Sequence, residues 1–300
     1  MPSDDVLRTP DERFEGLPDY PFAPNYLEIT DPDLGALRQH YVDEGEGLTV
    51  VLLHGEPTWS FLYRKMIPIL VAGGYRVLAP DLIGFGKSDK PTDPAIYSYS
   101  RNVTWLNSWF EAAGVTECRL FCQDWGGLLG LRIVAAEPDR FVKVCAGNTA
   151  LPDGTGMPEG FFAWLNFSQS MTDIPVGQVA NMGSARTLTD AEIAAYDAPF
   201  PSEEYKVASN LFPKLVPHNP TIPGAIDNRA AWRSLETFEK PFLTLFSDGD
   251  PVTYGKERMM IERIPGAAGL PHEILKGGGH FLQEDVGEDL ARRLVAFFAD

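Results

Sequence analysis

The stretch Cys122-Gln123-Asp124-Trp125-Gly126-Gly127 decides the fold of this chain. An apolar run, Leu120–Phe121, precedes it, and a helix-like segment over 128–136 follows it. This is the context of a nucleophile elbow, a sharp strand-to-helix turn that presents one side chain at the edge of a sheet. Asp124 stands where many hydrolases carry a serine, and a carboxylate attacks carbon to form an ester, so the pattern indicates displacement rather than acyl transfer. The alternative is a buried aspartate that caps the following helix.

Composition and charge narrow the classes of protein to which the chain can belong. Hydrophobic residues make up 44% of its 300 residues, which is enough for a sizeable core. The formal net charge of −17 disfavours nucleic acid and anionic membranes as partners, because phosphate groups bind to basic surfaces. The three cysteines are too few and too irregularly spaced for a disulfide framework or a zinc site. With no secretory signal and no apolar run of membrane-spanning length, we expect a soluble, cytoplasmic protein.

Short apolar runs separated by helix-length segments predict a parallel sheet that is buried on both faces. The expected strands are 48–53, 75–79, 120–121, 142–146 and 241–246. Polar residues gather just past the ends of these runs, where open α/β sheets place their sites.

Residues 151–226 follow a different pattern, in which the strand-like periodicity disappears. Turn-rich borders enclose helix-like stretches, among them 189–196, where Thr189 and Glu192 predict a capping box. We interpret 151–226 as a helical cap inserted into a core formed by 1–150 and 227–300. The alternative is an irregular continuation of the core.

A general base and an acid that orients it can be sought among the remaining residues by role. His280 follows a glycine-rich turn, 276–279, that could present its ring over the sheet edge, so we expect it to be the base. His54 ends the first buried strand and is more typical of a structural ring, whereas His272 is expected at the surface. Asp248 and Asp250 both follow the strand 241–246. Asp250 is favoured as the acid, because the Asp248-Gly249 pair is typical of a turn.

A site in which negative charge develops also needs hydrogen-bond donors to stabilise that charge. The backbone N–H groups of Glu56 and Trp125 are expected to form an oxyanion hole. The side chain of Glu56 could position water or could be a plain surface acid. The indole N–H of Trp125 is a donor only, which suits an anion such as a leaving halide.

Three motifs resemble those of the haloalkane dehalogenases of the α/β-hydrolase fold: Asp124-Trp125-Gly126-Gly127, His54-Gly55-Glu56-Pro57-Thr58-Trp59 and Gly279-His280-Phe281. The runs 7–14, 20–25 and 81–90 are also similar, so the resemblance covers nearly the whole chain and is weakest in the cap. It implies an α/β fold with a mostly parallel central sheet flanked by helices and an inserted helical cap. Glu56, where the other type of the family carries an asparagine, is typical of the subfamily with two tryptophans as halide donors. The second tryptophan of that subfamily lies on the first cap helix, which implies Trp164 here.

The resemblance also implies a mechanism. Asp124 attacks the halogen-bearing carbon, Trp125 and Trp164 bind the halide, and His280, oriented by Asp250, activates water to hydrolyse the ester. The expected partners are a small apolar halogenated substrate, halide and water, in a monomer or small homo-oligomer. No metal or organic cofactor is required. An apolar cavity lined by Phe161, Phe162 and Phe167 is expected, although core packing explains these residues equally well.

Two other functions stay open at this point. An epoxide hydrolase of the same fold also carries an Asp-Trp turn, but it needs two cap tyrosines, for which Tyr196 and Tyr205 are the candidates. A non-catalytic binding protein of this fold would have lost a member of the triad, and all three members have candidates here.

Overall fold

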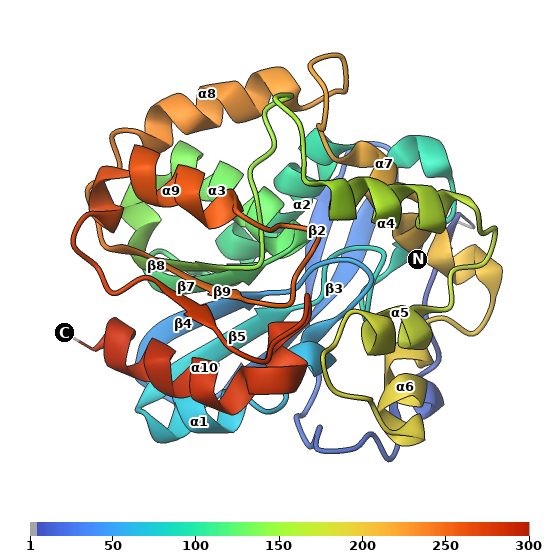
Figure 1. Cartoon of the computed structure of the whole chain (residues 1–300). Helices are drawn as coiled ribbons and strands as arrows, with labels where there is room; N and C mark the ends of the chain where they lie inside the picture. The colour runs from blue at the N-terminus through green and yellow to red at the C-terminus, as the bar shows by residue number, and fades with distance from the viewer. Residues whose placement is uncertain (1–4, 300) are drawn as a thin grey trace.

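A mixed sheet lies at the centre of the computed structural model, which describes residues 5–299 (Figure 1). Within these residues the sheet has eight strands in the order β10-β9-β8-β7-β4-β5-β3-β2. Neighbouring strands are parallel except that β3 is antiparallel to both β2 and β5. The strands are β2 (Asn25–Asp31), β3 (Gly35–Glu44), β4 (Leu48–Leu53), β5 (Tyr75–Pro80), β7 (Cys118–Gln123), β8 (Phe141–Gly147), β9 (Phe242–Ser247) and β10 (Glu273–Leu275). A separate antiparallel pair joins β1 (Val6–Leu7) to β6 (Lys90–Pro91).

The five strands expected from apolar runs are confirmed as β4, β5, β7, β8 and β9. Their central residues are fully buried, because helices cover both faces of the sheet. Figure 1 shows α1 and α10 on one face and α2, α3, α8 and α9 on the other. These helices are α1 (Ile67–Ala72), α2 (Tyr99–Ala112), α3 (Trp125–Ala136), α8 (Ala225–Leu235), α9 (Lys256–Arg263) and α10 (Leu282–Phe298). The expectation of a mostly parallel α/β fold is therefore confirmed.

A helical insert separates β8 from α8. Between β8 and α8 the regular elements of the described chain are α4 (Glu159–Gln169), α5 (Val176–Met182), α6 (Asp190–Asp197), the short 3₁₀ helix η5 (Glu203–Lys206) and α7 (Val207–Leu215). The capping box predicted at the start of α6 is confirmed, since Thr189 and Glu192 each bind the other's backbone N–H. The insert enters after the carboxyl end of β8, so it lies beside the edge of the sheet where the predicted site residues gather.

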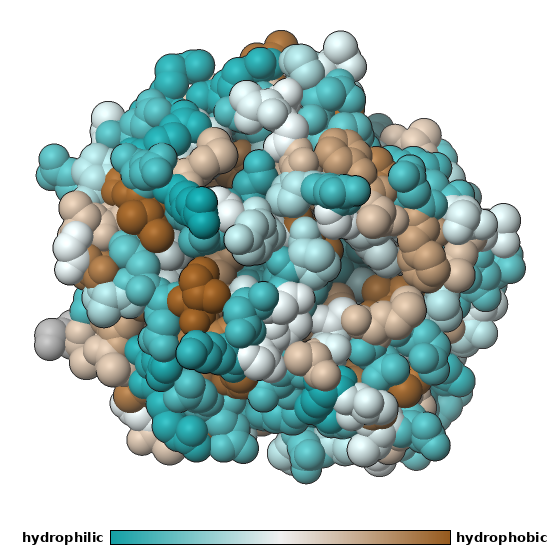
Figure 2. Space-filling view, in the orientation of Figure 1, coloured by the Kyte–Doolittle hydropathy of each residue, from teal (hydrophilic) through white to brown (hydrophobic). Residues whose placement is uncertain are grey.

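The outer face seen in Figure 2 is mainly hydrophilic, with hydrophobic residues scattered between polar ones. Scattered apolar residues are normal on a water-exposed surface. Among the described residues, none of the helices combines the length and the apolar character needed to cross a bilayer.

Candidate active site

Asp124 lies between β7 and α3 on a strained turn. Its φ of 48° falls in the left-handed region, which is costly for a residue with a side chain and occurs mainly where surrounding structure enforces it. Two glycines make the turn possible. A Cβ on Gly126 would lie 2.1 Å from the Leu53 carbonyl oxygen, and one on Gly55 would lie 2.1 Å from Oδ1 of Asp124. The elbow predicted from the sequence is thus present, and the half-buried Asp124 lies at its tip.

Two groups from distant parts of the chain contact the carboxylate of Asp124. The backbone N–H of Glu56 donates to Oδ1 at 2.8 Å, and Nε2 of His280 lies 3.5 Å from Oδ2. Trp125 is the first residue of α3, so its backbone N–H has no acceptor within the helix. Of the two amides expected to form an oxyanion hole, that of Glu56 contacts the carboxylate.

His280 and Asp250 form a buried pair. Nδ1 of His280 lies 3.0 Å from Oδ1 of Asp250, which follows β9 and also accepts hydrogen bonds from the Val252 amide and the Thr253 hydroxyl. Asp248, the other candidate acid, is exposed and accepts a hydrogen bond from the Gly277 amide. The structure thus brings Asp124, His280 and Asp250 together and leaves Asp248 in a turn, as the sequence indicated.

The charged side chains of this triad shift one another's pKa values. Burial lowers the pKa of His280, but the carboxylates of Asp250 and Asp124 outweigh it and raise that pKa to about 10. Burial raises the pKa of Asp250, yet the neighbouring imidazole leaves it below its usual value. The carboxylates beside His280 therefore favour the protonated form of its ring.

The carboxyl group of Glu56 is buried. It is 4% exposed, so the interpretation as a plain surface acid is wrong. Burial raises its pKa well above the usual value, and the nearby charge of Asp124 raises it further. Its Oε1 atom is buried and makes no hydrogen bond among the described residues.

Two amide side chains hold the histidine loop and were not predicted. Nδ2 of Asn148, directly after β8, donates to the carbonyl oxygens of Gly279 at 2.9 Å and His280 at 3.0 Å. Nε2 of Gln123 donates to the same His280 oxygen at 3.2 Å. Their position in the sequence could have indicated this role, because both amides lie at the carboxyl ends of buried strands.

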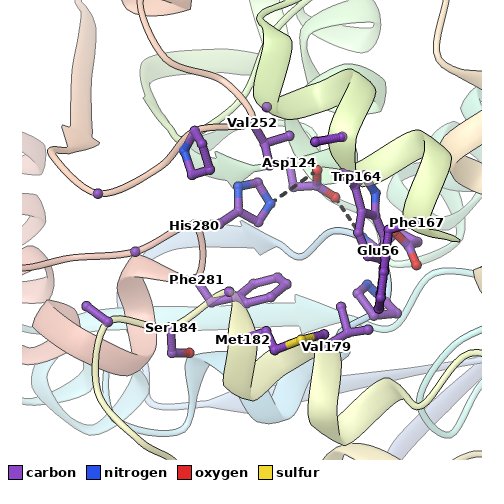
Figure 3. A pocket seen from close by; sticks show the side chains of 18 residues that line it. Glu56, Asp124, Trp164, Phe167, Val179, Met182, Ser184, Val252, His280 and Phe281 are labelled. Atoms are coloured by element: carbon purple, nitrogen blue, oxygen red, sulfur yellow. Dashed lines mark hydrogen bonds and ion pairs between the residues drawn. The ribbon is translucent and has the colours of Figure 1, made fainter.

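A cavity of about 450 Å³ opens above Asp124. Its walls come from the loop after β4, the elbow, the insert and the two loops that carry Asp250 and His280. They include Glu56, Asp124, Trp164, Phe167, Val179, Met182, Val252, His280 and Phe281. Figure 3 shows the carboxylate of Asp124 between the ring of His280 and the indole of Trp164. A smaller void of about 20 Å³ is lined by Asp124, Trp125 and Trp164 together. The two predicted halide donors therefore border one small space beside the predicted nucleophile.

The expected aromatic lining is correct only in part. Phe167 lines the large cavity and Phe161 lines the small void. Phe162 is 37% exposed and packs against the ring of His218, so its expected place in the lining is wrong. Adjacent residues on a helix point about 100° apart, and only one of the two phenylalanines can face the site.

The other histidines have structural contacts. His54 accepts a hydrogen bond from the Leu82 amide and bonds the Gly55 carbonyl, which confirms it as a structural ring. His272 was expected at the surface but is half-buried, and its Nδ1 accepts a hydrogen bond from the Thr244 amide. In residues 5–299 no group of three or more His, Cys, Asp or Glu side chains is arranged to hold a metal ion.

An aspartate on the elbow, a histidine before the last helix and a mostly parallel eight-stranded sheet define an α/β hydrolase. The chain matches the alpha/beta hydrolase family over residues 50–293. It is 53% identical to a haloalkane dehalogenase of Psychrobacter cryohalolentis, covering 98% of each chain, and 49% identical to one of Mycobacterium marinum, covering 98% and 99%. It is also similar to the solved structure of haloalkane dehalogenase DpaA from Paraglaciecola agarilytica NO2, with a TM-score of 0.87, 36% identity and coverage of 98% and 99%. The chain belongs to the haloalkane dehalogenases, hydrolases that act on carbon–halide bonds.

Proposed function

We propose that this haloalkane dehalogenase works through a covalent ester on Asp124, and that it belongs to the subfamily with two tryptophans as halide donors. The observation that carries the proposal is the arrangement of the triad. Asp124 and His280 line one cavity, with Oδ2 and Nε2 3.5 Å apart, and Oδ1 of Asp250 lies 3.0 Å from Nδ1 of His280 behind it. A carboxylate next to a base that is itself oriented by an acid can perform nucleophilic catalysis followed by hydrolysis.

In the first step a carboxylate oxygen of Asp124 attacks the carbon of the carbon–halogen bond from the side opposite the halogen. The new carbon–oxygen bond forms as the halogen leaves with the bonding electron pair. The indole N–H groups of Trp125 and Trp164 donate to the departing halide in the small void. Such bonds strengthen as negative charge develops, so they favour the transition state over the neutral substrate.

In the second step His280 takes a proton from water, and the resulting hydroxide attacks the carbonyl carbon of the ester. The amides of Glu56 and Trp125 stabilise the oxyanion, and Asp250 keeps Nδ1 protonated so that Nε2 is the basic atom. The negative charge of Asp124 is one cause of the raised pKa of His280, and esterification removes this charge. The base thus becomes less strongly protonated at the stage where it must accept a proton. Collapse releases the alcohol, and a proton leaves the site.

The insert supports an interpretation as a cap over an apolar substrate. We assign residues 151–226 to this cap and residues 1–150 and 227–300 to the core. Side chains of α4 and α5 form one wall of the cavity and those of the core form the other. Its volume falls in the range of about 300–1,000 Å³ that is typical of small-molecule sites, so a haloalkane longer than two carbons fits.

The tyrosines that an epoxide hydrolase would need do not support that alternative. The hydroxyl of Tyr196 donates to Oε1 of Glu284 in a buried cluster, and neither Tyr196 nor Tyr205 is among the described residues that line the cavity. An epoxide oxygen in the cavity would therefore lack the two donors that protonate it.

The test compares bromide release from 1,2-dibromoethane with diol formation from styrene oxide. We expect bromide release by the wild type and none by Asp124→Ala, while Asp289→Ala on the exposed side of α10 stays fully active. His280→Phe should form one equivalent of ester and stop, so intact-mass spectrometry should find the alkylated chain. Diol without bromide would overturn the assignment, as would bromide release by Asp124→Ala.

A further inference from the structure

One turn of the insert is connected to both neighbours of His280, to Phe281 directly and to Gly279 through a side chain of α10. The turn is Gly183–Arg186, between α5 and α6. The backbone N–H of Phe281 donates to the Gly183 carbonyl at 3.1 Å. The other connection runs through Asp285 on α10, whose carboxylate accepts from the Gly279 amide at 2.8 Å.

The carboxylate of Asp285 binds the turn at the same time. Its Oδ2 also accepts from the Ala185 amide at 2.8 Å, and its Oδ1 accepts from the Arg186 amide at 2.9 Å. A single half-buried side chain thus joins the insert to the loop that carries His280. A charged acceptor makes hydrogen bonds of roughly twice the usual strength.

The turn and the histidine loop are in close contact at two glycines. A Cβ on Gly279 would lie 2.5 Å from the Gly183 oxygen, and a Cβ on Gly183 would lie 2.5 Å from the ring of Phe281. Figure 3 shows Ser184 on the same side of the cavity as Phe281 and His280. A displacement of the turn would therefore move the loop with it.

The turn is also fixed to the core by a cluster of charges. The guanidinium of Arg186 contacts Glu192 at 2.6 Å and Glu284 at 2.5 Å, and both carboxylates also contact the buried Arg64. The exposed fraction of the Arg64 side chain is zero. This side of the insert is held by charged contacts of low exposure, which are less screened by solvent than surface pairs.

The histidine loop needs such support because its own sequence supplies little. Residues 277–279 are all glycine, and Gly277 has a φ of 81°. Glycine restricts the backbone least of all residues. Asn148 holds the loop from the core side, and Asp285 holds it from the side of the insert.

We propose that Asp285 is a positioning residue for His280, and that the turn Gly183–Arg186 is the part of the insert that sets the base for ester hydrolysis. This inference rests on the proposed two-step function. Alkylation of Asp124 does not use His280, whereas hydrolysis of the ester does. Loss of Asp285 must therefore slow the second step and spare the first.

The experiment measures the two steps separately with 1-bromobutane. Rapid-quench mass spectrometry of the intact chain gives the rate of ester formation and its decay. For Asp285→Ala we expect ester formation within about twofold of the wild type and hydrolysis slower by about 10-fold to 100-fold, because small displacements of catalytic groups are costly. The ester then becomes the main species during turnover. Asp285→Glu, which keeps the acceptor, should recover part of the loss.

Two further variants serve as a second test and as a control. Arg186→Gln weakens the cap side of the same connection and should give the same pattern with a smaller effect, even if Asp285→Ala folds poorly. Glu288→Ala, a loss of a carboxylate on the same helix whose partner is Arg292, should leave both steps unchanged. Equal slowing of both steps, or unchanged hydrolysis in a folded Asp285→Ala, would overturn the role of Asp285. Absence of any ester in His280→Phe would instead overturn the two-step function.

Discussion

Oδ1 of Asp250 lies 3.0 Å from Nδ1 of His280, although Asp248, two residues earlier, follows the same strand. The difference lies in the direction of the loop after β9. Asp250 is 3% exposed and its carboxylate is held by the amide of Val252, whereas Asp248 is turned outward to the amide of Gly277. Only the inner carboxylate can orient the imidazole.

Asp250→Asn should therefore cripple turnover, and Asp248→Asn should not. An asparagine at 250 can present an N–H to Nδ1 and favour the wrong tautomer, for which a loss of about 10³-fold to 10⁴-fold in kcat is expected by analogy with other triads. Asparagine at 248 keeps an acceptor for Gly277, so we expect kcat within about twofold, as for most exposed substitutions. Steady-state bromide release checks both variants. The opposite ranking would assign the acid to Asp248.

The stability of the protein should fall at alkaline pH because of His280. Its pKa rises from 6.5 to about 10 on folding, since Asp250 and Asp124 outweigh the effect of burial. A raised pKa stabilises the fold fully below pH 6.5, and that contribution is lost as the pH rises through about 10. The difference in unfolding free energy between the wild type and His280→Phe should thus shrink from pH 6 to pH 10. Urea unfolding at several pH values measures it, and a constant difference would contradict the prediction.

The fold could be predicted where the pattern is local. The runs 48–53 and 75–79 are continuous and apolar because both faces of their strands are buried, and the elbow is a contiguous motif. β2 and β3 were not predicted. They form the antiparallel edge, where residues such as Arg38 and Gln39 interrupt the apolar pattern, and their pairing is set by contacts distant in sequence.

The same distinction applies to the site. Asp124 and His280 are marked by their immediate neighbours, the tryptophan and glycines after one and the glycine turn before the other. Asn148 has no such mark, because its partner, the loop carrying His280, lies 132 residues further along the chain. Its role becomes visible only when the strand order β8-β9-β10 places the carboxyl end of β8 near the loop that follows β10.

Trp164→Phe should weaken halide binding without abolishing the fold. The substitution keeps an aromatic ring at the wall of the small void and removes one N–H donor from it. A hydrogen bond to a charged group contributes about 1.5–3 kcal/mol, so the halide Kd should rise by about 10-fold to 100-fold. Bromide quenching of tryptophan fluorescence measures the affinity.

Trp105→Phe is the matched control for that measurement. Its indole N–H donates to Asp31 at 2.8 Å, away from the cavity, so the variant loses one tryptophan without losing a predicted halide donor. Bromide affinity should then equal that of the wild type. An unchanged affinity in Trp164→Phe would move the second halide donor to another residue.

Glu284→Gln should destabilise the fold more than any surface substitution on α10. Burial raises the pKa of Glu284, but the contacts with Arg64 and Lys65 lower it to about 2, so the group is ionised when folded. Removing its charge leaves the fully buried guanidinium of Arg64 with one carboxylate partner, Glu192, in place of two. Breaking a buried pair in this way costs about 3–5 kcal/mol.

Urea unfolding should resolve this loss against Glu288→Gln, whose exposed pair with Arg292 contributes at most about 1 kcal/mol. The comparison separates burial from charge, because both substitutions neutralise one carboxylate on the same helix. A loss in Glu284→Gln no larger than that in Glu288→Gln would mean that Glu192 alone satisfies Arg64. In that case Arg186 would also keep its ion pair with Glu192. The insert would then be anchored through Glu192 on α6 rather than through Glu284 on α10.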